Sequence, residues 1–419
     1  GSTSSSDCLD ADAGYYVDST GSTDQTECAV GTYQSSTGQS SCLDSDAGYY
    51  VDSTGSSTQT ACSLGTYQPS TGQTDCLDAD AGYYVDSTGS TDQTECAVGT
   101  YQSSTGQSSC LDSDAGYYVD STGSSTQTAC SLGTYQPSTG QTDCLDADAG
   151  YYVDSTEAIS QTACSLGTYQ PSTAQSNCLD ADAGYYVGST EAISQTACSL
   201  GTYQPSTAQS SCLDSDAGHY VDSTGSNSQT ECAVGTYQPS TGQSSCLDAD
   251  AGYYVDSTGS SSQTACSLGT YNPNTGSSDS SSCLDADAGH YVDSTGSDSQ
   301  TECAVGTYQP STGQSNCLDA DVGHYVDSTA SSTQTACSLG TYQPSTAQSN
   351  CLDADSGNYV DSTGSSTQNA CSLGTYQPST AQSSCLDADA GYYVDATGSS
   401  SQTECAVGTY QPSTGQTDC

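Results

Sequence analysis

Two aspartates that recur throughout this chain are the residues best suited to chemistry. The stretch "CLDADAGYYVDST" at residues 8–20 places Asp10 and Asp12 before a glycine, and Asp18 follows six residues after Asp12. Asp-x-Asp-x-Gly with a further Asp is similar to the start of a calcium loop, where alternate carboxylates supply hard oxygen ligands. The EF-hand pattern also needs a third ligand before its glycine and a bidentate Glu at position twelve, and both are absent here.

The acidic positions therefore have three interpretations. They form a calcium site, or a solvated acidic strip that blunts edge-to-edge aggregation, or a surface loosely screened by divalent cations. The residue equivalent to Asp18 is Gly188 in one copy, which weakens the first interpretation. We expect no cofactor other than calcium, and its candidate ligands in the first repeats are Asp10, Asp12, Asp18, Asp44, Asp46, Asp52, Asp78, Asp80 and Asp86.

Other side chains give little reason to expect catalysis. His219, His290 and His324 lie in separate repeats, each in place of a tyrosine that we expect to be exposed. No serine lies in a nucleophile elbow beside a base. We therefore expect no enzyme. The Ser-Thr-Gly and Pro-Ser-Thr clusters are candidates for O-linked sugars, or are simply turn residues.

The elements that position these residues must fit an unusual composition. The chain has no Lys or Arg and a formal net charge of −50, which disfavours nucleic acid and anionic membrane surfaces as partners. Only 32% of residues are hydrophobic, and no apolar run is long enough to span a membrane. The 25 cysteines indicate disulfide cross-links, and hence an extracellular or cell-surface location.

The spacing of the cysteines defines a 34-residue repeat. Their separations alternate between 20 and 14, and Gly14 and Gly31 mark the two related halves of the first repeat. Each half reads as a short extended segment, a turn-forming Ser-Thr-Gly cluster and a polar return to a cysteine, which is typical of a small β-hairpin. The predicted fold is mainly β with much irregular structure: an elongated, disulfide-stapled tandem-repeat rod of small hairpins, with a 34-residue period in two 17-residue halves.

The domain organisation follows from this period. Residues 8–419 are predicted to form twelve tandem 34-residue repeats, and residues 1–7 match the end of a truncated repeat. A three-residue insertion near 277–282 is the one break in the spacing, and we expect the hairpin loop to absorb it.

Tyrosine is expected to build the interior. In an extended segment neighbouring residues point to opposite faces, so Gly14 and Tyr16 share one face and Tyr15 points away. We predict an aromatic ladder that packs over glycine backbone and disulfide sulfur, with Tyr15-type residues exposed. The ladder residues of the first two repeats are Tyr16, Tyr33, Tyr50 and Tyr67.

Two regular disulfide schemes join neighbouring cysteines. Pairing across the shorter separation leaves Cys8 unpaired, and pairing across the longer separation leaves Cys419 unpaired. We favour the first, because the shorter loop is a tight hairpin with its turn at Ser-Thr-Gly. The favoured pairs begin with Cys28–Cys42, Cys62–Cys76, Cys96–Cys110 and Cys130–Cys144 and continue to Cys405–Cys419.

The motifs "C-A-V-G-T-Y" and "C-S-L-G-T-Y" resemble the Cys-Pro-x-Gly-Thr-Tyr signature of ephrin-receptor-like cysteine-rich repeats, which are similar to those of tumour-necrosis-factor receptors. Ala29 or Ser63 stands where the family has Pro. Ala11, Ser45 and Ala79 stand where the second cysteine of a Cys-x-x-Cys would be. The resemblance implies a rod of disulfide-stapled hairpins in a surface protein without catalytic residues.

The predicted function is structural: a subunit of an extracellular filament or fibre, or a cell-surface stalk. The expected partners are copies of the chain or other cell-surface material. The alternative is an adhesive or ligand-binding ectodomain, stabilised by calcium, in which exposed Tyr15-type rings and acidic strips hold a partner. Near-identity of the repeats favours the structural prediction, because a specific site usually breaks a repeat.

Overall fold

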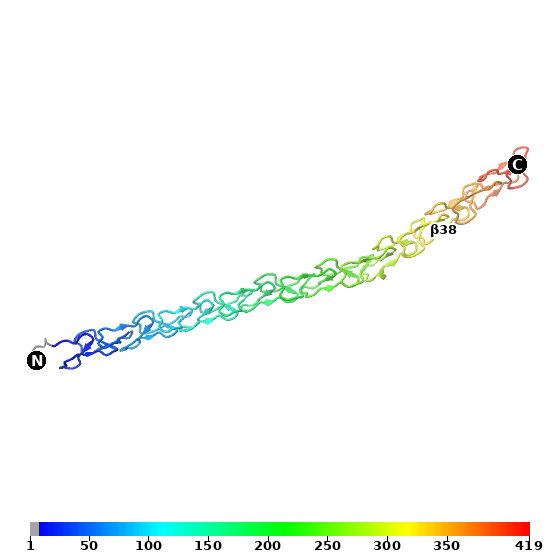
Figure 1. Cartoon of the computed structure of the whole chain (residues 1–419). Coiled ribbons are helices and arrows are strands. Elements are labelled where there is room, and N and C mark those ends of the chain that lie inside the picture. The colour runs from blue at the N-terminus through cyan, green and yellow to red at the C-terminus, as the bar shows by residue number, and fades with distance from the viewer. Residues whose placement is uncertain (1–7) are drawn as a thin grey trace. The chain divides into compact units, whose positions relative to one another are not determined.

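The computed structural model describes residues 8–419, so the expectation for residues 1–7 lies outside the described residues. Within the described range the chain forms two-residue strands paired in antiparallel hairpins, which confirms the predicted fold class. Figure 1 shows these hairpins following one another along the chain.

A repeat contains two hairpins with the same register, except that the insertion shifts the pairing to Thr270 with Asp285 in one second hairpin. In the first repeat, β1 (Tyr15–Tyr16) and β2 (Thr26–Glu27) form the first hairpin, and β3 (Thr32–Tyr33) and β4 (Leu43–Asp44) form the second. The pattern returns in the following repeats, with β5 (Tyr49–Tyr50), β6 (Thr60–Ala61), β7 (Thr66–Tyr67) and β8 (Leu77–Asp78) next. The last pair is β45 (Tyr392–Tyr393) and β46 (Thr403–Glu404), and residues 408–419 contain no strand. The one helical element of the described range is a single 3₁₀ turn, η2 (Ser280–Ser282).

Within each of the two compact units described below, backbone hydrogen bonds join a hairpin to the next one along the chain. The N–H of Gly14 donates to the carbonyl of Gln34 at 2.7 Å, and the N–H of Gly31 donates to the carbonyl of Val51 at 2.8 Å. These bonds recur at the same separation from one hairpin to the next, with Gly48 and Gly65 as the next donors. A two-stranded hairpin alone is marginally stable in water, so these bonds between hairpins are needed for order.

Hairpins of the same kind also pack on one another. Gly14 has φ +89, and a Cβ at this position would overlap the carbonyl oxygen of Gly55, which lies in the turn of the next first hairpin. Gly31 stands in the same relation to Gly72, the turn glycine of the next second hairpin. Only glycine satisfies both the left-handed conformation and this close approach. We call these positions the register glycines.

The interior differs from the predicted tyrosine ladder. Tyr49 and Tyr50 are both half-buried, so the expected contrast between an exposed first tyrosine and a buried second one is wrong. The fully buried side chains are small, with Val51, Cys62 and Ala79 at most 3% exposed. Gln68 is buried with them at 4% exposure. Two-residue strands are too short for face alternation to decide burial, so the contacts between hairpins decide it instead.

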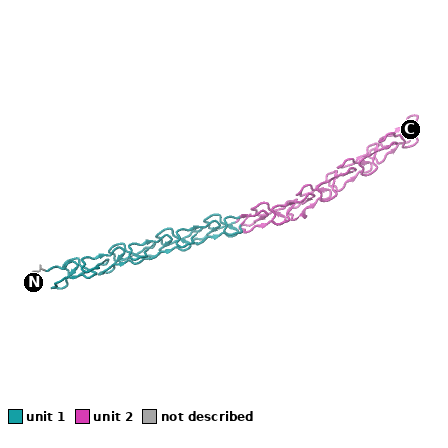
Figure 2. Cartoon of the chain, viewed as in Figure 1, with its two compact units in different colours: residues 1–197, 204–212 teal, residues 198–203, 213–419 magenta. Residues whose placement is uncertain are grey.

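The chain divides into two compact units, which Figure 2 colours separately. One unit comprises residues 1–197 with 204–212, and the other residues 198–203 with 213–419. Each unit is an elongated stack of hairpins with the contacts described above.

Candidate functional site

The most regular chemical feature of each repeat is the way in which the two ends of each hairpin are joined. We call the place where these two ends meet the neck of the hairpin. In the second hairpin a disulfide closes the neck. Cys28 pairs with Cys42 and Cys62 with Cys76, with Cα–Cα distances of 5.7 and 5.8 Å. The same sequence separation of 14 recurs along the chain to Cys405–Cys419, with Cys266–Cys283 as the exception at 17. In the described residues Cys8 forms no disulfide and is exposed.

The first hairpin is closed without covalent chemistry. The backbone N–H of Asp46 donates to Oε1 of Gln59 at 2.7 Å, and Nε2 of Gln59 donates back to Oδ2 of Asp46 at 2.6 Å. We call this reciprocal pair the Asp–Gln clasp. It recurs in every copy from Asp12–Gln25 to Asp389–Gln402.

The clasp uses one of the two carboxylates that the sequence singled out as a calcium pair. The structure places the two acids in different surroundings: Asp46 binds Gln59, whereas the carboxylate of Asp44 lies against the turn glycine Gly72. The third candidate, Asp52, accepts from Oγ of its neighbour Ser53 at 3.2 Å. Within residues 8–419 no group of three His, Cys, Asp or Glu side chains is arranged to hold a metal ion. Calcium binding by these aspartates remains a prediction.

The glutamine of the clasp was not recognised in the sequence. The signal was present, because a Gln follows the second Asp at a constant separation in each copy, as Gln25 follows Asp12. A polar residue in a polar loop normally faces solvent, so the spacing alone did not indicate a contact.

A second glutamine braces the second hairpin from inside. Nε2 of Gln68 donates to the carbonyl of Asp75 at 2.8 Å, and its Oε1 accepts from the N–H of Ser70 at 3.2 Å. Burying an amide is costly unless its donors and acceptors are paired, and both ends of this side chain are paired. Val51 takes the equivalent place in the first hairpin, three residues after its register glycine, and is 3% exposed.

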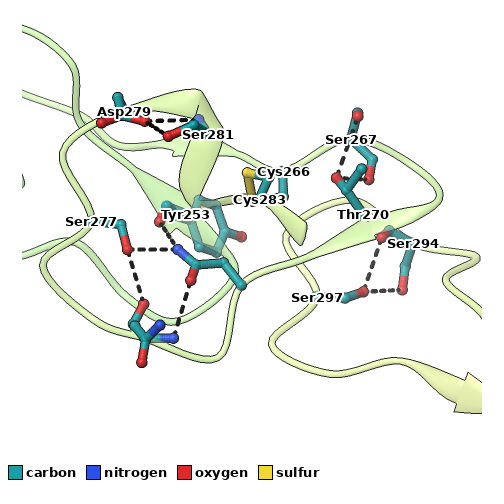
Figure 3. Close-up of a disulfide and its surroundings, with 12 residues drawn as sticks. Tyr253, Cys266, Ser267, Thr270, Ser277, Asp279, Ser281, Cys283, Ser294 and Ser297 are labelled. Atoms are coloured by element: carbon teal, nitrogen blue, oxygen red, sulfur yellow. Dashed lines mark hydrogen bonds between the residues drawn. A yellow bond between two sulfur atoms is a disulfide. The ribbon is translucent and has the colours of Figure 1, made fainter. Parts of the chain in front are cut away.

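The three-residue insertion shows how much variation the second hairpin accepts. Figure 3 shows the disulfide Cys266–Cys283, which has a sequence separation of 17 and a Cα–Cα distance of 5.6 Å. The extra residues form η2, whose N-cap Asp279 accepts from the N–H of Ser281 at 2.8 Å. Asn272 replaces the bracing glutamine, and its Nδ2 donates to Oγ of Ser277 at 2.7 Å. The insertion thus enlarges the loop and leaves the neck unchanged.

Some tyrosines of the first hairpin are paired with acids. Tyr83 lies opposite Glu95, and its hydroxyl donates to Oε1 of that residue at 3.3 Å. The nearby carboxylate of Glu95 raises the pKa of Tyr83, since ionising the phenol would place two negative charges side by side. Tyr15 is paired with Glu27 in the same way, and Glu27 raises its pKa.

Large apolar side chains flank each disulfide neck on the surface. Leu64 lies two residues after Cys62, Leu77 directly follows Cys76, and the two leucines are 52% and 49% exposed. This apolar rim recurs with every second hairpin, as Val98 and Leu111 in the next repeat. Its regular period distinguishes it from the single exposed apolar residues of ordinary surfaces.

Comparison with known families agrees with this geometry. Four segments match the family described as "tyrosine-protein kinase ephrin type A/B receptor-like", at residues 48–96, 116–164, 184–232 and 218–266. The resemblance found in the sequence is thereby confirmed: these segments are ephrin-receptor-like cysteine-rich repeats. No curated protein matches the chain.

The repeat type and the disulfides together define the broad class of the protein. Ephrin-receptor-like repeats are a non-catalytic, extracellular kind of domain, and disulfides persist in oxidising surroundings. They indicate an extracellular or secreted protein. Within residues 8–419 there is no helix of the length and apolarity needed to cross a bilayer.

Proposed function

We propose that this chain is a structural element of extracellular material, serving as a filament or fibre subunit or as a cell-surface stalk. The observation that carries the proposal is the unchanged contact from hairpin to hairpin. Gly14 donates to Gln34 at 2.7 Å near one end of the described chain, and Gly357 donates to Gln377 at 2.7 Å near the other. Because the hairpins within each compact unit support their neighbours in the same way, length can be varied without building new contacts.

The surface supports the same proposal. The apolar rims, such as Leu64 and Leu77, return once per repeat and offer contacts to a neighbouring molecule at a matching period. The net charge of −50 opposes close approach of two copies until cations screen it. The proposed lateral association is therefore strongest at high ionic strength. The absence of Lys and Arg from this sequence also removes every cleavage site for trypsin-like proteases.

Electron microscopy tests the proposal most directly. Native material labelled with an antibody to this chain is expected to show labels at a regular spacing along fibres or stalks. Purified chain, imaged at low and high salt, is expected to associate side by side only at high salt. Label confined to isolated cell-anchored molecules would contradict the filament form. Specific capture of one soluble ligand would favour the ectodomain alternative.

The calcium prediction is tested separately. The aspartates that lie outside the clasp, such as Asp44 and Asp78, have exposed carboxylates available to cations. Thermal melting of the oxidised chain with calcium and with chelator would show a shift of several degrees if a specific site forms. An unchanged melting temperature would contradict a calcium site and support the interpretation of these residues as a solvated acidic strip.

A further inference from the structure

The two hairpins of a repeat have equivalent backbones. In the first hairpin the N–H of Cys62 donates to the carbonyl of Gly48 at 2.9 Å, and in the second the N–H of Ala79 donates to the carbonyl of Gly65 at 2.8 Å. Both bonds join a register glycine to the residue at the same offset further along the chain. A residue in one hairpin can therefore be matched to its counterpart in the other by its distance from the register glycine.

This equivalence relates the clasp to the disulfide. Cys62 and Cys76 stand three residues before and eleven residues after Gly65. The residues with the same offsets from Gly48 are Ser45 and Gln59. Gln59 thus occupies the place of the second cysteine. It bonds to Asp46, the residue after the place of the first one.

The two closures differ in how they respond to a pulling force. A disulfide holds its loop until a covalent bond breaks, whereas the clasp consists of hydrogen bonds between exposed groups that water can replace. The pulling force passes through the disulfide between Cys28 and Cys42, so the residues inside the loop that it closes are not stretched. Only the segment from Cys42 to Cys62, which contains the whole first hairpin, lies in the direct path of the force.

We propose that each repeat is an extensible unit in which the first hairpin opens at its Asp–Gln clasp under tension while the disulfide keeps the second hairpin closed. The contacts between successive second hairpins, such as that of Gly31 with Gly72, separate in the same step. The chain then lengthens repeat by repeat and refolds when the force is removed, because the closed second hairpins keep the template for the backbone bonds. The biological use of this device rests on the proposed structural function. The device itself is a property of the single molecule.

Single-molecule stretching of the full oxidised chain tests this proposal. An extended chain spans at most about 3.3–3.6 Å per residue, so the free segment between two disulfides releases roughly 65–70 Å per repeat, less its folded length. Reduction frees the segment inside the disulfide loop and is expected to add roughly 40–45 Å per repeat after allowing for the 5.7 Å that the disulfide already bridges. Equal steps in the oxidised and reduced chain would overturn the proposal.

A matched pair of variants isolates the clasp. Gln59→Leu removes the clasp of one repeat and is expected to produce one opening event at lower force with an unchanged step length. Gln73→Leu is the control, because Nε2 of Gln73 donates only to Thr71 within its own turn, at 3.0 Å. The same opening force in both variants would show that the clasp does not hold the hairpin.

A covalent clasp gives the opposite result. Ser45→Cys combined with Gln59→Cys places cysteines at the positions equivalent to Cys62 and Cys76. Once mass spectrometry shows the new disulfide, the step of that repeat is expected to shorten to the few residues that remain free on either side of the new loop, and reduction restores it. A full-length step from the cross-linked variant would overturn the proposal. All these measurements use isolated chains, so failure of the filament proposal in microscopy would leave them interpretable.

Discussion

The first and second hairpins of each repeat share one backbone geometry, and they differ in the side chains that close the neck and fill the loop. At the neck the first hairpin has the Asp46–Gln59 clasp, and the second has the Cys62–Cys76 disulfide. Inside the loop the first buries Val51, and the second buries Gln68 with both ends of its amide paired. The backbone geometry is therefore set by the register glycines and the bonds between hairpins, whereas the side chains set how firmly each hairpin is closed.

Loss of the disulfides is expected to cause the largest change in the stability of the chain and in the difference between the two kinds of hairpin. A disulfide that closes a loop of about 15 residues contributes roughly 3 kcal/mol, and every second hairpin has one. Reduction should remove most of the difference between the two kinds of hairpin and unfold the chain far below its oxidised melting temperature. Circular dichroism during heating, with and without reductant, measures this. Coincident melting curves would contradict a dominant role for the disulfides.

Substitution of a register glycine is next in size. Gly65 has φ +86, and the methyl group of Gly65→Ala would overlap the carbonyl oxygen of Gly106, so we expect a loss of about 2–5 kcal/mol. Gly72→Ala is the matched control, because the nearest atoms there belong to the movable Asp44 side chain, at 3.5 Å. Its cost should be about 1 kcal/mol. Ala174 already occupies the equivalent turn position with φ 57. Urea unfolding compares the two variants, and equal losses would refute the packing argument.

Removal of one clasp has a smaller and more local effect. Gln93→Ala deletes both bonds to Asp80, and because these groups are exposed we expect a loss of about 1 kcal/mol. Hydrogen exchange should show faster opening at the amide of Cys96, which bonds to Gly82 within the same hairpin. Gln107→Ala, which loses only a bond to Thr105 in its own turn, should leave that exchange rate unchanged. Similar rates in both variants would argue against the clasp as the closure of the first hairpin.

The pairing of Tyr83 with Glu95 gives the smallest effect. The carboxylate raises the pKa of Tyr83, so the folded chain retains this proton at a pH where the unfolded chain has begun to lose it. The contribution to stability is complete below about pH 10, the ordinary pKa of tyrosine, and is lost as the pH rises through the folded pKa. Ultraviolet titration of tyrosinate should show one tyrosine ionising at lower pH in Glu95→Gln. An identical titration curve would contradict the interaction.

Much of the architecture could be predicted from the sequence because it depends on local features. The 34-residue period, the two hairpins and the glycine at each register position follow from the spacing of Cys, Gly and Tyr and from turn chemistry. The core could not be predicted in the same way. The predicted Tyr16-type ladder placed the large tyrosine rings in the interior. The structure instead buries small residues such as Val51 and Ala79, because neighbouring hairpins pack closely at glycine.

The sequence by itself determined the repeat, the hairpin positions, the acidic surface and the extracellular class, because composition and spacing carry that information directly. Only the tertiary structure decided that Asp46 forms hydrogen bonds with Gln59, that Gln68 is buried, and that Gly14 packs against the carbonyl of Gly55 in the next repeat. The reason is that two-residue strands contain too little pattern to specify a face. Burial and pairing are set where hairpins distant along the chain come into contact.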